Sequence, residues 1–251
     1  MNTFFLDRLN SEPHALAFAG QSTPWPVALA DQSANPALDE ALHTHAAAAQ
    51  ALLYPVSAEL LATTGRPVDL FGFEPNPARL GAAAAASASV PGIALTQLGA
   101  LLDAAALGYN PAQAKPVVVL GHSQGVLAVH MVQAICEAGS IDAAAAKIDE
   151  ILAIATLIGV AGTRQARQLG LAARHGEATP MLSVKDITRA QVDALIERVD
   201  GARGPIAVAV TNSATHYVLS GYPEDLAAFG VEVAKEHKRQ AKLREEKVRG
   251  G

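Results

Sequence analysis

The feature that most constrains the fold is a β-branched run that leads into Gly-His-Ser-Gln-Gly at residues 121–125. Residues 116–120 read Pro-Val-Val-Val-Leu, which is typical of a central strand in a parallel sheet, because such a strand is buried on both faces. Residues 124–137 carry the apolar spacing of an amphipathic helix. A strand, a sharp turn and a helix in this order predict an α/β fold in which Ser123 projects from the turn.

The small residues that flank Ser123 indicate a nucleophile. They allow the chain to reverse tightly, so the serine hydroxyl can reach a crevice above the sheet. Backbone N–H groups at the start of the following helix, that of Gln124 above all, can stabilise the oxyanion of a tetrahedral intermediate. A Gly-rich turn with a structural role only is the alternative.

Composition narrows the class of protein. Half of the 251 residues are apolar but only 4% are aromatic, which favours helices packed around an aliphatic sheet over a sandwich or a barrel. The net charge of −5 offers no basic field, so we expect neither nucleic acid nor a membrane as a partner. No leader or long apolar run is evident, and the single cysteine, Cys136, predicts a buried side chain in a reducing, cytoplasmic compartment.

A second segment could contribute to the same site. Residues 15–19 predict a buried strand that stops in a turn at Gly20-Gln21-Ser22. A backbone N–H of this turn could point at Ser123 as a second oxyanion donor, and a plain turn is the alternative. Helices are expected at 36–64, 90–107 and 142–167, a loop at 65–81, and a helix or linker at 82–88.

The last third of the chain has a different character. Short strands are predicted at 181–184, 206–210 and 217–219, with helices that begin after Thr188 and at Glu224. This β-α-β-β-α order predicts a ferredoxin-like α+β subdomain without its last strand. The expected organisation is a hydrolase-like α/β core with a parallel sheet at 1–177, the incomplete subdomain at 178–237 and a charged tail at 238–251.

A nucleophilic serine needs a base, normally histidine. His122 adjoins Ser123 and should point to the opposite side of the strand end, so we expect it to contact substrate or to pack. His130 should be partly buried on the following helix. Surface positions are expected for His14, His43, His45 and His175, whereas His216 and His237 remain candidates without a motif.

Several segments together resemble the malonyl/acetyl-CoA:acyl carrier protein transacylase family. They are Ala-Phe-Ala-Gly-Gln at 17–21, Gly-His-Ser-Gln-Gly at 121–125, Ile158-Gly159 and Asn212-Ser213. The sequence is most similar to the N-terminal acetyltransferase region of bacterial type I fatty acid synthases of the mycobacterial and corynebacterial kind.

The resemblance implies that Ser123 takes an acyl group from coenzyme A as an oxyester and passes it to the phosphopantetheine thiol of a carrier domain. It implies that the backbone amides of Gln21 and Gln124 form the oxyanion hole. It further places four residues at the substrate: His122, Ile158, Gly159 and Asn212. No cofactor or metal is implied, and the expected partners are acetyl-CoA, the carrier domain and other domains of a homo-oligomeric synthase.

One departure from the family concerns the acyl group. Malonyl-using relatives have an arginine directly before the glycine, which pairs with the free carboxylate, and Ile158 stands at this place here. A buried carboxylate facing Ile158 would lack a partner, which predicts acetyl or another short uncharged acyl group. Arg164 or Arg167, further along the helix, could instead reach in.

The other departure concerns the base. In the family the catalytic histidine follows the small subdomain, and no such segment is present in the sequence. The missing histidine and the missing last strand agree, so we hypothesise that this chain is a fragment of a longer synthase. An α/β-hydrolase of the thioesterase kind, with an acid and a histidine after the serine, and an inactive scaffold are the competing interpretations.

Overall fold

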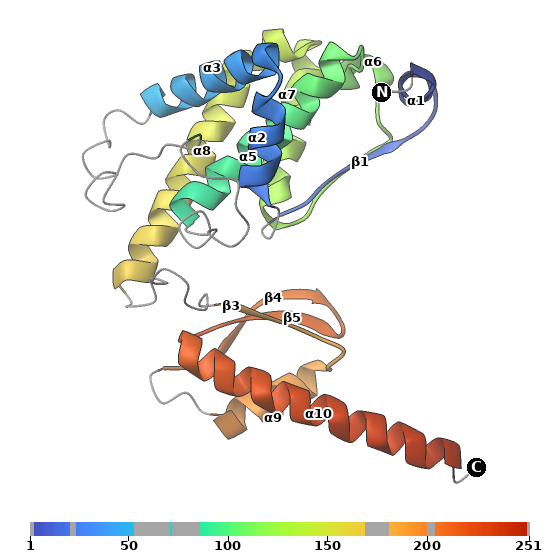
Figure 1. The fold of residues 1–251 in the computed structure, drawn as a ribbon, viewed down its shortest axis with the longest axis vertical. Coiled ribbons are helices and arrows are strands. Elements are labelled where there is room, and N and C mark those ends of the chain that lie inside the picture. The colour runs from blue at the N-terminus through green and yellow to red at the C-terminus, as the bar shows by residue number, and fades with distance from the viewer. Residues whose placement is uncertain are drawn as a thin grey trace. The chain divides into compact units, whose positions relative to one another are not determined.

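The computed structural model describes residues 3–20, 24–52, 71, 86–168, 181–199 and 204–249. The chain divides into two compact units, Met1–Gln165 and Ala166–Gly251, so the division falls earlier than the predicted boundary after residue 177. Figure 1 shows the helices of the first unit gathered in a bundle with two strands along one flank.

The described elements of the first unit run, in chain order, through α1 (Thr3–Ser11), β1 (Ala15–Phe18), α2 (Trp25–Ser33), α3 (Pro36–Leu52), α5 (Ala86–Ala106), α6 (Pro111–Ala114), β2 (Val118–Gly121), the 3-10 turn η3 (Ser123–Gly125), α7 (Val126–Ala138) and α8 (Ile141–Gln168), which crosses the division. Helix α5 is buried on most of its surface because α2, α3 and α7 all contact it. It is long and apolar enough to cross a membrane, but 72% of its most apolar stretch is buried inside the protein, as in a core helix.

Strands β1 and β2 lie side by side and parallel, in agreement with the parallel sheet predicted for the core. Their burial differs from the prediction. Leu16, Phe18 and Val119 pack against the core, whereas Val118 is 43% and Leu120 is 57% exposed on the opposite face. An apolar strand sequence therefore predicted burial on both faces, but the described helices cover only one.

Several histidines and the cysteine lie in surroundings that the sequence did not predict. His14 Nε2 accepts a hydrogen bond from the buried Tyr109 hydroxyl at 2.8 Å, and His45 Nδ1 lies 2.6 Å from Asp149 Oδ1, so neither is a plain surface residue. The expected burial of His130 and Cys136 is wrong, because both lie on the outer face of α7 and are exposed.

The second unit contains β3 (Met181–Lys185), α9 (Arg189–Val199), β4 (Ala207–Ser213), β5 (His216–Ser220) and α10 (Pro223–Arg249), in the predicted β-α-β-β-α order. The strands form an antiparallel three-stranded sheet in the order β3-β5-β4. Both helices contribute to one core with the sheet, through side chains such as Leu195, Leu219 and Phe229. This is the arrangement of a ferredoxin-like sheet without its fourth strand among the described residues.

Local sequence explains where the helices of this unit begin and end. The predicted cap at Thr188 is confirmed, because Gln191 N donates to Thr188 Oγ1 and Thr188 N donates to Gln191 Oε1 at 2.9 Å, a reciprocal capping box. Helix α10 continues through the segment predicted as a charged tail and ends at Arg249. Its apolar contacts with the core extend only to Val233, so its later turns are largely exposed.

Candidate active site

Ser123 stands between the end of β2 and the start of α7, as the motif predicted. Its backbone is in the left-handed region, with a φ of 54°. A non-glycine residue rarely adopts this conformation, which costs about 1–3 kcal/mol and persists only where the surroundings impose it. The side chain is exposed, so the strained turn presents a hydroxyl at the surface of the first unit.

The glycines on either side of the serine are required by close packing. A Cβ on Gly121 would lie 2.5 Å from Val126 N, and a Cβ on Gly125 would collide with the carbonyl oxygen of Phe18. His122 N also donates to the Phe18 oxygen at 3.0 Å. The turn therefore packs directly on the end of β1, and its geometry requires glycine at both positions.

The turn after β1 also lies beside the nucleophile. A Cβ on Gly20 would lie 2.8 Å from Ser123 Cβ and 3.3 Å from Gln124 N. Gln97 Nε2, from α5, donates to the Ala19 oxygen at 2.5 Å and so holds this turn from behind. The predicted oxyanion donor Gln21 lies outside the described residues.

Gln97 is a residue that the sequence interpretation missed. It is buried within α5, where most neighbouring side chains are apolar. A buried glutamine in such a helix needs a hydrogen-bond partner. This requirement was the one feature of the sequence that could have indicated a structural contact for Gln97. Periodicity could not reveal that the partner is the carbonyl oxygen at the end of β1.

Among the described residues of the first unit, no hydrogen bond joins the Ser123 hydroxyl to another side chain. The neighbouring His122 is exposed, and His14 and His45 are engaged with Tyr109 and Asp149. In the second unit, Ser183 and the Lys185 carbonyl oxygen lie within hydrogen-bond distance of His216 and His237 respectively. His175 lies outside the described residues.

The residues expected to contact substrate fall in different surroundings. Ile158 is 51% exposed on α8, where Ile154 and Leu157, at helical spacing, are also exposed. Gly159 is buried, because a Cβ there would collide with the Ala86 carbonyl oxygen, so this glycine allows α8 to approach the start of α5. Asn212 belongs to β4 of the second unit.

Of the two arginines that could substitute for the malonyl-binding one, Arg164 is exposed on α8, and the side chain of Arg167 lies outside the described part. No group of three or more His, Cys, Asp or Glu side chains is placed to hold a metal ion among the residues described.

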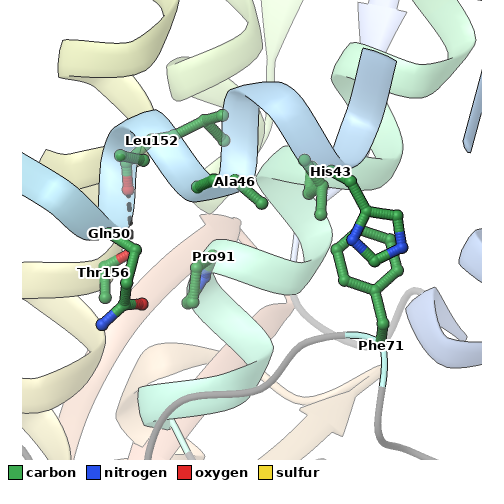
Figure 2. A pocket seen from close by; sticks show the side chains of 10 residues that line it. His43, Ala46, Gln50, Phe71, Pro91, Leu152 and Thr156 are labelled. Carbon is green, nitrogen blue, oxygen red and sulfur yellow. Dashed lines mark hydrogen bonds between the residues drawn. The ribbon is translucent and has the colours of Figure 1, made fainter. Parts of the chain in front are cut away.

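A cavity of about 200 Å³ lies between α3, α5 and α8, away from the residues of the serine turn. Figure 2 shows the His43 ring stacked on Phe71 at one end, with ring centroids 3.6 Å apart, and Gln50, Pro91 and Thr156 at the other. The Thr156 hydroxyl donates to the Leu152 oxygen at 2.9 Å, so it is engaged within its own helix.

A parallel strand that leads through a strained serine turn into a helix has the arrangement of the serine elbow found in α/β proteins. A ferredoxin-like sheet follows it in the same chain. The chain belongs to the family described as "Starter unit:ACP transacylase in aflatoxin biosynthesis", which matches residues 74–247, more than half of the sequence.

Individual proteins are similar to this chain as well. The chain is 30% identical over 143 residues to the fatty acid synthase beta subunit hexB of Dothistroma septosporum, a match that covers 51% of this chain and 7% of that subunit. It is similar in structure to the malonyl CoA-acyl carrier protein transacylase of Coxiella burnetii, at 18% identity and a TM-score of 0.50 over 90% of this chain and 58% of that one. The FabD protein of Acinetobacter baumannii gives 17% identity and a TM-score of 0.51 over 89% and 58%.

At these identities the structural matches establish the fold, and the predicted α/β class and the resemblance to the transacylase family are confirmed. The chain spans about three fifths of the length of these transacylases and a small part of the synthase subunit.

Proposed function

We propose that this chain forms the Ser123 half-site of an acyl-CoA:acyl carrier protein transacylase in fatty acid or polyketide synthesis. The observation that carries the proposal is the strained backbone of Ser123, held at a φ of 54° between Gly20 and the start of α7. Such strain is imposed by the surrounding structure and is concentrated at active sites, which supports a functional role for this turn. Membership of the starter unit:ACP transacylase family gives the reaction class.

The reaction proceeds in two displacements. Ser123 Oγ attacks the thioester carbonyl carbon of acyl-CoA while its proton passes to a base, the C–S bond breaks, and coenzyme A leaves as the thiol. The Gln124 N–H, at the start of the helix, donates to the oxyanion, and the amide of Gln21 is the second donor. The phosphopantetheine thiol of the carrier then attacks the ester and releases the serine.

The acyl group is acetyl or another short uncharged group. Ile158 stands at the place of the malonyl-binding arginine, and Ile154 and Leu157 beside it on α8 are apolar as well, so a malonyl carboxylate placed there would gain no cation from these side chains. His122, exposed beside the nucleophile, supplies a polar contact to the bound substrate.

The base comes from outside this chain, as a histidine in a further segment of a longer synthase. Two observations support this proposal. No described side chain of the first unit is hydrogen-bonded to Ser123, and the apolar face of β2 carries the exposed Val118 and Leu120. Parallel strands are normally covered on both faces, so further polypeptide would fit against them.

Acylation of Ser123 by acetyl-CoA and malonyl-CoA tests the proposed specificity. We expect intact-mass measurements to show the acetyl ester forming at least about tenfold faster, with none in Ser123→Ala. Ile158→Arg should shift the preference towards malonyl, whereas Ile154→Arg, one turn away on the same helix face, should not. A wild-type preference for malonyl would overturn the specificity, and an ester absent with both donors would overturn the role of Ser123.

A further inference from the structure

A serine, a histidine and an asparagine meet on the sheet of the second unit. Leu182, Val184 and Leu219 point into the core shared with α9 and α10. Because side chains alternate along a strand, Ser183 and His216 lie on the opposite, open face. Ser183 Oγ lies 2.9 Å from His216 Nε2, and Asn212 Nδ2 lies 3.4 Å from the same nitrogen.

The direction of these hydrogen bonds follows from the chemistry of the groups. In the tautomer with its hydrogen on Nδ1, His216 Nε2 carries one lone pair, to which an amide nitrogen or a hydroxyl can donate. At 2.9 Å against 3.4 Å, the Ser183 hydroxyl is the better-placed donor to this lone pair. A serine that donates to an imidazole lone pair within 2.6–3.2 Å is the arrangement that activates a nucleophile.

The residues around Ser183 leave its hydroxyl accessible to a small acyl donor. Ser183 is exposed and His216 is half-buried, so the histidine is held in the sheet while the hydroxyl is accessible on this unit. Val218 pairs with Ser183 on one side and with Val210 on the other. Val210 is 43% and Met181 is 41% exposed, so apolar surface flanks the polar cluster.

We propose that Ser183 is a second acyl-accepting nucleophile, independent of Ser123, with His216 as its base. The substrates are activated esters and thioesters of short acyl chains. Ser183 Oγ forms a bond to the carbonyl carbon while its proton moves to His216 Nε2, and the Asn212 amide donates to the oxyanion. The bond between the carbonyl carbon and the sulfur or oxygen of the leaving group then breaks. The leaving group takes the proton from His216 Nε2, and Ser183 keeps the acyl group as an oxyester.

The experiment uses residues 1–251 carrying Ser123→Ala, with p-nitrophenyl acetate as the probe. Peptide mapping by mass spectrometry then measures the ester on each serine. Ser220, on the same strand face as His216, is the internal reference for an ordinary serine. We expect at least about tenfold more ester on Ser183 than on Ser220, and a fall of at least about tenfold at Ser183 in the additional variant His216→Gln.

Two results would overturn the proposal. Equal ester on Ser183 and Ser220 would make Ser183 an ordinary surface hydroxyl, and this comparison requires no change at the histidine. Unchanged acylation of Ser183 in His216→Gln, with the same thermal midpoint as its parent, would exclude the histidine as base. Because Ser123 is absent from every variant, neither result depends on the proposed transacylase reaction.

Discussion

At the residue scale, Gly20 controls the geometry of the nucleophile. A Cβ at this position would lie 2.5 Å from the His122 oxygen and 2.8 Å from Ser123 Cβ, so Gly20→Ala must displace the turn. We expect this change to cost about 1–3 kcal/mol of unfolding free energy and to slow acylation of Ser123 at least about tenfold. Urea unfolding and the rate of labelling by a fluorophosphonate measure the two effects.

Gly230→Ala is the matched control for Gly20→Ala. Gly230 lies inside α10, and the nearest atom to an added Cβ is Leu182 Cδ2 at 3.8 Å, an ordinary contact. Alanine is the better helix former, so this variant should gain about 0.5–1 kcal/mol. A Gly20→Ala protein that labels at the wild-type rate would show that the turn after β1 does not position Ser123.

The sequence located the serine turn but not its surroundings. Gly-His-Ser-Gln-Gly after a β-branched run is a local pattern with a local mechanical cause, so Ser123 could be predicted. The contact of Gln97 with Ala19 joins residues 78 positions apart, and the pairing of His45 with Asp149 spans 104. Such pairs depend on how helices pack, and no periodicity within either helix encodes them.

At the element scale, His45 and Asp149 tie α3 to α8. Their side chains are only 11% and 18% exposed, and the atoms Nδ1 and Oδ1 lie 2.6 Å apart. Removing one partner leaves the other poorly solvated, so His45→Ala should cost about 1.5–3 kcal/mol of unfolding free energy. Lys147→Ala is the control, because its partner Glu150 and the lysine itself are both more than half exposed, and it should cost less than about 0.5 kcal/mol. Equal urea midpoints for the two variants would contradict the proposed role of the pair.

Glu236 gives the second unit a predictable response to acid. Its hydrogen bond from Arg239 above all, then that from Gln240, the charge of Arg239 and a hydrogen bond from Gln191 lower its pKa from 4.5 to about 2, while burial opposes them. Since the folded pKa is the lower one, the carboxylate stabilises the fold fully above pH 4.5 and progressively less as the pH falls towards 2.

Glu236→Gln should therefore remove part of this acid sensitivity. The variant should be less stable than the wild type at neutral pH, by on the order of 1 kcal/mol because Arg239 is largely exposed to solvent, and the difference should shrink between pH 4.5 and 2. Urea unfolding of the second unit over this range provides the measurement. A difference that is constant with pH would show that Glu236 is not the titrating group.

The order of elements could be predicted because periodicity and capping are local. The box at Thr188 and the β-α-β-β-α order followed directly from the sequence. The bare faces of β1 and β2 could not be predicted, because an apolar strand has the same sequence whether or not a second layer covers it. Helix α10 continues past its last core contact because its charged residues are good helix formers. The same residue types occur in solvated tails, so the sequence did not distinguish a helix from a tail here.

At the scale of the whole molecule, the first unit exposes several large apolar side chains. Val118 and Leu120 on β2, Val126 at the start of α7 and Ile158 on α8 are all more than 40% exposed. Exposed apolar side chains next to the serine turn, such as Val126, are consistent with the proposal that another segment completes the site, so the origin of the base is the property of the whole molecule to test.

Added imidazole should replace a base that this chain does not supply. If Ser123 lacks its histidine, raising the imidazole concentration at neutral pH should accelerate its acetylation by acetyl-CoA by about tenfold or more, because an imidazole can then take the hydroxyl proton. The rate is followed by intact mass, and Ser123→Ala reports acetylation elsewhere. His175→Gln is the necessary control, because a rate that depended on His175 would place the base within this chain. A rate that does not change with imidazole would likewise mean that Ser123 already has its base.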